Sequence, residues 1–228
     1  MSDYKSSRST SCDCAVAAPP KGGWAAVALA WLYILSSAAW AGNPSVLQYV
    51  NSADSGQATV SGTSTLHDWT VKGNVIKGNV VFSGELNTAA PPITLQSIDL
   101  VVPVDSLKST EGDRMDNTMY DALKLKQYPT ITYKLTAASL KSVPSQPGAA
   151  YHFGANGQLI VAGTSHPIYL DLAVVPHDDG RMTITTDVGM KMTDCGVTPP
   201  TAMLGMIKSG DIITVNVTWQ LTKATLIK

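Results

Sequence analysis

Residues 211–222 read DIITVNVTWQLT, and this stretch decides the fold class. Its apolar side chains, which recur at every second position, are Ile213, Val215, Val217, Trp219 and Leu221. Thr, Asn and Gln occupy the positions between them. Because successive side chains of a β-strand point to opposite faces, this alternation predicts a strand with one apolar and one polar face.

The same alternation recurs along most of the chain after residue 45. The further candidate strands are residues 57–63, 69–76, 80–86, 98–104, 131–135, 158–162, 167–175 and 182–192. Turn-forming pairs such as Asn156-Gly157 and Asp179-Gly180 separate several of them. About eight or nine antiparallel strands with one apolar face each predict an all-β domain, either a sandwich or a closed barrel. Aromatic residues are only 7% of the chain and do not gather at strand ends, which favours a soluble barrel over an outer-membrane one.

One segment departs from the strand period. Residues 113–126 (DRMDNTMYDALKLK) carry Met115, Met119, Ala122 and Leu123 at helical spacing. Acidic residues lie in the early turns and lysines at the end, which suits the helix dipole, and a proline follows at 129. We therefore predict one short amphipathic helix over residues 113–126, near a barrel mouth, and a second helical turn over residues 200–207.

The N-terminal segment has the pattern of a secretory signal peptide. A polar, partly basic leader is followed by the apolar residues 24–35 (WAAVALAWLYIL) and then by Ala39-Trp40-Ala41, an A-x-A cleavage site. The alternative is an uncleaved anchor that holds the protein to the inner membrane by residues 22–41, because this uncharged stretch is as long as the roughly 20 residues that cross a bilayer. We predict a signal peptide or anchor over residues 1–41, one domain over residues 42–228, and a periplasmic or secreted protein.

Charge and cysteine content exclude several functional classes. The 228 residues hold 16 Lys and Arg against 17 Asp and Glu, so no general attraction to nucleic acid is expected. Cleavage would leave Cys195 as the one cysteine, which we predict to be buried and structural, without a disulfide. The four histidines lack metal-ligand spacing and no nucleophile motif is present, so we predict neither a metal site nor an enzyme.

Several motifs resemble those of the YceI-like family. The run Met115 to Lys124, followed by Tyr128 to Tyr133, is similar to that family's helix-then-strand signature. Residues 162–168 (AGTSHPI), residues 190–221 and Ser64 to Trp69 (STLHDW, the His-Asp-Trp version) are similar to its other signatures. Cys195 departs from the pattern, because the family commonly has an aromatic residue there.

The resemblance implies a single eight-stranded, lipocalin-like antiparallel barrel. It also implies an exported protein that holds a long isoprenoid, quinone or fatty-acid-like molecule, and for some relatives a cytochrome b561-like membrane partner. Ligand identity does not carry over with the motifs. Two alternatives stay open, a packed barrel that acts as an interaction or stress-response module and an enzyme on a barrel scaffold.

Inward-facing positions supply the candidate ligand contacts. Met adapts its shape to flexible apolar ligands, and the apolar faces include several Met. The predicted contacts inside the barrel are Phe82, Met119, Ile131, Tyr133, Met190, Met192, Val217 and Trp219. His67 and Trp69 are predicted to form a polar handle at one barrel end, which hydrogen-bonds either a ligand headgroup or the backbone.

Overall fold

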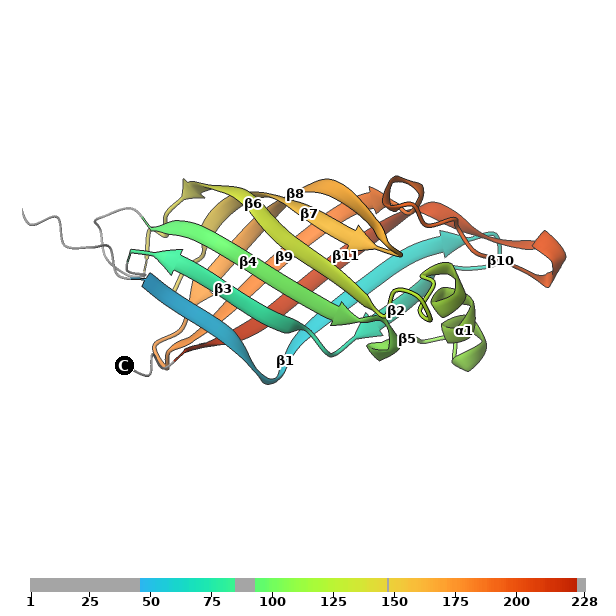
Figure 1. Ribbon diagram of the computed structural model, residues 1–228, viewed down its shortest axis with the longest axis horizontal. Helices are drawn as coiled ribbons and strands as arrows, with labels where there is room; N and C mark the ends of the chain where they lie inside the picture. The colour runs from blue at the N-terminus through green and yellow to red at the C-terminus, as the bar shows by residue number, and fades with distance from the viewer. Residues whose placement is uncertain (1–45, 85–92, 147, 225–228) are drawn as a thin grey trace, which may run out of the picture. The chain divides into compact units, whose positions relative to one another are not determined.

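The computed structural model describes residues 46–84, 93–146 and 148–224, and antiparallel strands dominate these ranges (Figure 1). Gly42–Lys228 is a compact unit of its own, separate from Met1–Ala41. Every strand described here lies within that unit. The predicted signal peptide or anchor, residues 1–41, lies outside the described residues. Among the residues described, no helix is long and apolar enough to cross a membrane.

The regular elements follow one another in the order that the periodicity indicates. The strands are β1 (Val46–Ser64), β2 (Trp69–Gly73), β3 (Lys77–Ser83), β4 (Thr94–Pro103), β5 (Leu107–Ser109), β6 (Thr130–Ser142), β7 (Tyr151–Val161), β8 (Thr164–Pro176), β9 (Arg181–Lys191), β10 (Thr201–Ala202) and β11 (Ile207–Lys223). The described residues contain one α-helix, α1 (Asp113–Ala122), between β5 and β6. Three 3-10 turns complete the set: η1 (Val104–Ser106), η2 (Thr193–Cys195) and η3 (Met203–Gly205).

Within the described ranges, eight strands close into an antiparallel barrel. Hydrogen-bonded neighbours follow the order β1, β3, β4, β6, β7, β8, β9 and β11, and β11 returns to β1. The closing register pairs Val217 with Ala58 and Val215 with Val60. The predicted all-β fold, a single eight-stranded barrel with one short helix, is confirmed. A two-sheet sandwich is excluded because the sheet closes on itself.

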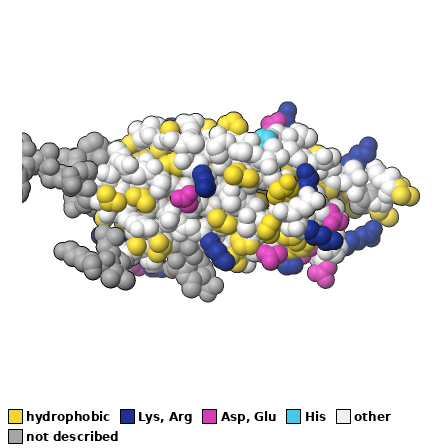
Figure 2. Space-filling view, viewed as in Figure 1, with side chains coloured by type: hydrophobic (Ala, Val, Ile, Leu, Met, Phe, Trp, Pro, Cys, Tyr) yellow, Lys and Arg dark blue, Asp and Glu magenta, His cyan; other side chains and the backbone are white. Residues whose placement is uncertain are grey.

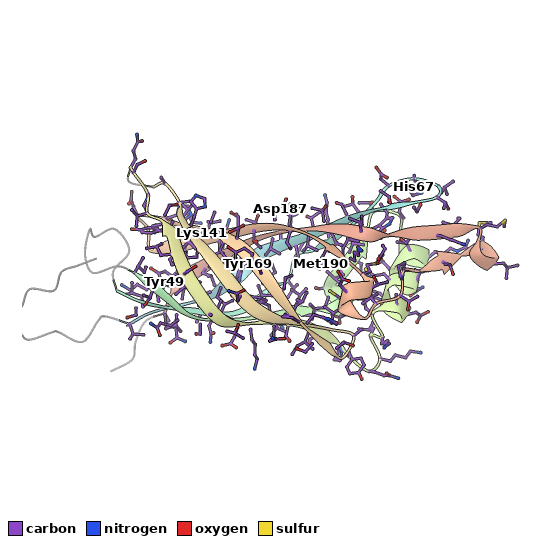
Figure 3. The ribbon with its side chains drawn as sticks, turned by 90° about the horizontal axis from the view of Figure 1, so that it is seen from above. Tyr49, His67, Lys141, Tyr169, Asp187 and Met190 are labelled. Atoms are coloured by element: carbon purple, nitrogen blue, oxygen red, sulfur yellow. The ribbon has the colours of Figure 1, made fainter. Side chains whose placement is uncertain are left out.

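One half of the barrel interior is filled by large side chains. In this packed half, Phe82, Phe153, Met182 and Leu221 are at most 1% exposed. The Phe82 ring meets the rings of Tyr49 and Phe153 at centroid distances of 6.2 and 5.9 Å. Figure 3 shows Tyr49 and His67 toward opposite ends of the barrel. Burial of these side chains provides most of the hydrophobic stabilisation at the end remote from α1.

Two expectations about helices need correction. Helix α1 ends at Ala122, not at residue 126, because Lys124 adopts a left-handed conformation (φ 55°) that cannot continue an α-helix. The second helical turn, predicted over residues 200–207, is reduced to the three-residue 3-10 turn η3 (Met203–Gly205). The chain forms a hairpin there, in which β10 pairs with the start of β11, and Met203 and Leu204 both have left-handed φ values. The apolar spacing of this segment resembles a helix, but its side chains do not cover a core.

Candidate functional site

The other half of the barrel, toward α1, is hollow. It contains an apolar cavity of about 240 Å³. Strands β9 and β11 supply much of one wall, because inward positions on the two strands face each other in register: Ile213 with Met190, Val215 with Val188 and Val217 with Thr186. The alternating apolar side chains of residues 211–222 therefore line the cavity wall. A cavity of this size exceeds the roughly 150 Å³ that holds benzene in an apolar protein interior.

Most of the predicted ligand contacts line this cavity. They are Trp69, Met119, Ile131, Tyr133, Met190, Met192, Val217 and Trp219. Phe82, expected among them, lies instead in the packed half, at 0% exposure and away from the cavity. Alternation predicts which face a side chain occupies, but not how far along the barrel axis it sits.

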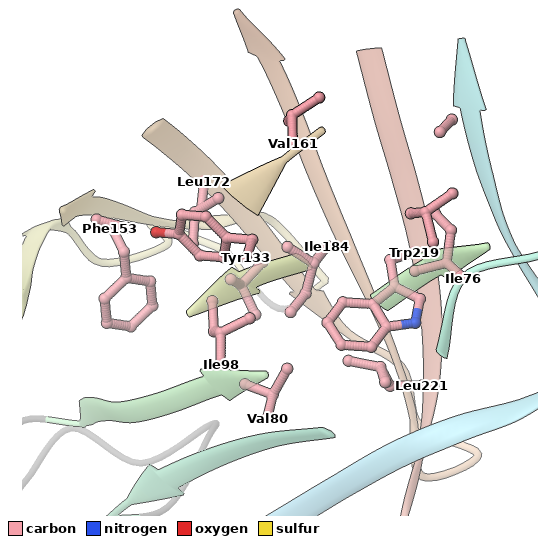
Figure 4. Packing of buried hydrophobic residues seen from close by; sticks show 14 of the residues in the cluster. Ile76, Val80, Ile98, Tyr133, Phe153, Val161, Leu172, Ile184, Trp219 and Leu221 are labelled. Atoms are coloured by element: carbon pink, nitrogen blue, oxygen red, sulfur yellow. The ribbon is translucent and has the colours of Figure 1, made fainter. Parts of the chain in front are cut away.

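Large side chains at mid-barrel form the floor of the cavity. Tyr133 and Trp219, at 5% and 1% exposure, lie there with Ile184 (Figure 4). Gly157 of β7 makes room for the Tyr133 ring, because a Cβ at this glycine would lie 2.4 Å from two of the ring carbons. The floor separates the hollow half from the packed half.

Three polar atoms at this level have no hydrogen-bond partner among the described residues. They are the Tyr133 hydroxyl oxygen, Trp219 Nε1 and Thr186 Oγ1. Burial raises the pKa of Tyr133 to about 12, because the surroundings disfavour the charged phenolate. Each unpaired group costs about 1–3 kcal/mol of stability. Their enclosure by protein atoms means that a ligand could reach them only after a side chain rotates.

Helix α1 covers the cavity. Its apolar side chains Met115 and Met119 point into the cavity. Asp116 of the same helix, 3% exposed, accepts a hydrogen bond from the Ser109 backbone N–H at 2.6 Å and pairs with Lys108 at 3.2 Å. Because the buried carboxylate is fully engaged, α1 is tied to β5. Sequence analysis did not find this anchor, although an Asp inside an amphipathic helix, next to an apolar position, is a signal for one.

A second, more polar cavity of about 240 Å³ lies at the barrel mouth, and we call it the vestibule. It is bordered by His67, Glu111 and Arg114, and it shares Trp69 and Met115 with the apolar cavity. The two cavities therefore adjoin each other. Together they fall within the roughly 300–1,000 Å³ that is typical of small-molecule sites.

The predicted polar handle is at this mouth. His67 Nε2 lies 3.6 Å from Glu111 Oε2, and its side chain is 49% exposed. Trp69 Nε1 donates a hydrogen bond to the Thr63 carbonyl oxygen at 2.9 Å, so this indole bonds the backbone. His67 Nδ1 lies 2.8 Å from the Asp68 carbonyl oxygen. The Nε2 side of His67, beside Glu111, is left to face the vestibule.

Two features of the described residues concern metal binding and thiol chemistry. No group of three or more His, Cys, Asp or Glu side chains among these residues could hold a metal ion. Cys195 is buried, as predicted, and its Sγ lies 3.7 Å from Met190 Sδ. Burial, and to a lesser degree the charge of Asp194, raise the pKa of this thiol, which disfavours the reactive thiolate. The arrangement is that of an apolar container with a polar mouth.

Comparison with known proteins gives a consistent result. The model of the YceI-like domain matches residues 49–221. BcnA from Burkholderia cenocepacia has a similar structure, with 16% identity, a TM-score of 0.54, and coverage of 77% of this chain and 99% of that one. A polyisoprenoid-binding domain from Saccharophagus degradans, implicated in plant cell wall breakdown, has 15% identity, a TM-score of 0.58, and coverage of 79% and 100%. At these identities the structural likeness concerns the fold alone. A search of the curated proteins gave no match.

Proposed function

Because the chain belongs to the YceI-like family, we propose that it is an exported protein that binds a long-chain amphipathic lipid inside its barrel. The ligand class is an isoprenoid quinone, a polyprenyl compound or a fatty-acid-like molecule. The structurally similar domain from Saccharophagus degradans, described as polyisoprenoid-binding, supports this class. The sequence pattern of residues 1–41, which lie outside the described residues, supports the proposal of export.

The observation that carries the proposal is an apolar cavity that adjoins a polar vestibule. Two side chains that line the cavity, Thr186 and Ser209, carry an aliphatic hydroxyl group. Almost all the other lining side chains are aliphatic, methionine or aromatic. The vestibule adds Arg114, His67 and Glu111. An amphipathic molecule matches this division, with its chain in the cavity and its headgroup at the mouth.

The gain from burying a hydrocarbon chain is sufficient for useful affinity. A tail that buries about 500 Å² of apolar surface gains roughly 12 kcal/mol before costs. Loss of translational freedom and ordering of the chain remove about half or more of this gain. A remainder of roughly 6 kcal/mol corresponds to a dissociation constant of tens of micromolar, without any single dominant polar contact.

An open interior disfavours the alternative of a packed barrel without a ligand. The alternative of an enzyme on a barrel scaffold needs polar groups that converge on a reacting atom. The polar atoms at the cavity floor, such as the Tyr133 hydroxyl and Trp219 Nε1, are enclosed by protein and unpaired. Binding is thus the function that the described residues support best.

The test begins with the protein purified from its host without detergent. Native mass spectrometry should show an adduct of several hundred daltons, and organic extraction should release a lipid. The same spectrum reports whether the chain begins near residue 42. A bare polypeptide mass, with no uptake of geranylgeraniol, an isoprenoid quinone or palmitate, would refute the proposal.

Two tryptophan substitutions on one strand provide matched variants. Val217→Trp places an indole in the cavity, whereas Thr218→Trp, one residue further, places it on the exposed face of β11. We expect the first variant to lose roughly tenfold or more of its lipid retention, because the indole occupies the space of the chain. The second should retain lipid as the unmodified protein does. Equal retention by both variants would place the ligand outside the cavity.

A further inference from the structure

Four large apolar side chains project into solvent beside the barrel mouth. Leu204 is 106% exposed, Met206 71%, Leu66 66% and Met203 52%. We call these four the apolar tip. Three of them lie on the hairpin between β10 and β11, and Leu66 lies in the turn between β1 and β2. Full exposure of adjacent large side chains is unusual for a surface that only faces water.

The backbone holds the apolar tip in place. Met203 and Leu204 have φ values of 50° and 55°, a conformation that L-residues with a Cβ rarely adopt, and Gly205 follows at 86°. The Thr65 hydroxyl donates to the Met206 carbonyl oxygen at 3.2 Å, and the Thr65 backbone N–H donates to the Lys208 carbonyl oxygen at 3.0 Å. The turn that carries Leu66 is thus bonded to the hairpin. Local strain that is retained in this way points to a functional constraint.

The apolar tip is continuous with the lipid site. Leu66 and Met203 border the vestibule. The vestibule in turn shares Trp69 and Met115 with the apolar cavity. The apolar tip therefore adjoins the vestibule, and the vestibule adjoins the apolar cavity.

The charges around the apolar tip suit an anionic surface. Lys208 is the one ionisable side chain in residues 196–210, and it is exposed. Arg114 borders the vestibule and follows the exposed Asp113 in the sequence, while Glu111 faces His67 at 3.6 Å. Figure 2 shows apolar side chains at the projecting end of the barrel, with Lys and Arg and also some Asp and Glu side chains near them. Apolar side chains flanked by cations are the pattern of a segment that inserts into a bilayer interface.

A protein partner fits this surface less well. A stable protein interface uses about 20–30 residues on each side, and the apolar tip offers four. A bilayer makes no such demand, because each apolar side chain gains by entering the interface independently. From these observations we propose that the apolar tip inserts into the surface of a lipid bilayer that contains anionic headgroups, and so positions the barrel mouth for exchange of lipid. The exchange role rests on the proposed function, whereas insertion does not.

The test compares three forms of the compact unit Gly42–Lys228, so that residues 24–35 do not contribute to membrane binding. The tip variant is Leu204→Ser with Met206→Ser, two exposed residues outside both cavities. The control is Val46→Ser with Val143→Ser, which are 57% and 64% exposed and lie at the other end of the barrel. Each form is sedimented with vesicles of phosphatidylethanolamine and phosphatidylglycerol. Equal melting temperatures verify that all three forms are folded.

We expect the unmodified protein and the control to sediment with the vesicles, and the tip variant to bind roughly tenfold more weakly. The proposal is overturned if all three forms bind equally or if none binds. It is also overturned if the tip substitutions change self-association in the absence of vesicles but leave sedimentation unchanged.

Transfer of labelled geranylgeraniol from the vesicles separates this proposal from the proposed function. The tip variant should load to the same final amount, but roughly tenfold more slowly, because it encounters the bilayer less often. If the unmodified protein takes up no geranylgeraniol, palmitate or isoprenoid quinone, the proposed function fails. Sedimentation then still decides whether the apolar tip binds membranes.

Discussion

Removing the Tyr133 hydroxyl should make the protein more stable. The hydroxyl is buried at the cavity floor, in a side chain that is 5% exposed, and no described residue accepts its hydrogen bond. In the unfolded chain water satisfies the group, so folding loses about 1–3 kcal/mol of hydrogen bonding there. Tyr133→Phe removes this loss and keeps the ring over Gly157. We expect the variant, freed of lipid, to gain about 1 kcal/mol or more at pH 7.

The same burial predicts a difference in alkaline solution. The pKa of Tyr133 rises from 10.0 in the unfolded reference to about 12 in the folded protein, because burial disfavours the phenolate. A raised pKa gives stability that is fully present below pH 10 and is lost as the pH rises toward 12. Between pH 9 and pH 11 the unmodified protein should therefore lose about 1 kcal/mol more than Tyr133→Phe.

Urea unfolding followed by circular dichroism measures both effects. Tyr120→Phe is the matched control, because the Tyr120 hydroxyl donates to the Leu107 carbonyl oxygen at 2.8 Å. Loss of that bond should destabilise the protein by about 1 kcal/mol. Both substitutions remove a phenol hydroxyl, but they should change the free energy of unfolding in opposite directions. Destabilisation by Tyr133→Phe of 1 kcal/mol or more would show that the hydroxyl has a partner and refute the reasoning.

Two further substitutions test the anchor of α1 and the packing of the floor. Asp116→Ala removes the acceptor of the Ser109 N–H and should lower the free energy of unfolding in urea by about 2–3 kcal/mol. The control Asp121→Ala, on the exposed side of α1, should lower it by less than about 0.5 kcal/mol. Equal effects of the two substitutions would contradict a role of Asp116 as anchor. Gly157→Ala places a Cβ 2.4 Å from the Tyr133 ring and should cost about 1–3 kcal/mol. Its effect should fall by at least about 1 kcal/mol when Tyr133 is replaced by Leu, and strict additivity of the two changes would argue against the contact.

The sequence predicts the strands and their inward faces well, because the period of two depends only on local geometry. Val217 and Trp219 face the interior as alternation requires, and Met119 faces it as helical spacing requires. Depth along the barrel is different, since it depends on strand register and tilt. Phe82 is inward as predicted, but register places it beside Tyr49, in the packed half.

The segment around residues 200–207 shows where local pattern misleads. Met203, Leu204 and Met206 have the spacing of an amphipathic turn, yet a helix there would have no core to cover. The pairing of Ala202 with Ile207 forces a tight reversal, and Gly205 completes it. The prediction of a helix over the whole segment failed because strand pairing between its two ends replaces helical hydrogen bonds, and apolar spacing does not reveal that pairing.

The position of the cavity follows from side-chain size and not from the backbone. Eight strands fix an interior just wide enough for side chains to fill it or for one small ligand. Where the inward positions hold Phe82 and Phe153, the interior is full. Where they hold Ala58, Val215 and Val217, the same width leaves a cavity. Because one half supplies the packing, the other half can stay empty without loss of the fold. Lipid binding thus depends on one half of the barrel, and folding stability depends mainly on the other half. An indole at position 217 should therefore abolish lipid binding and leave the protein folded.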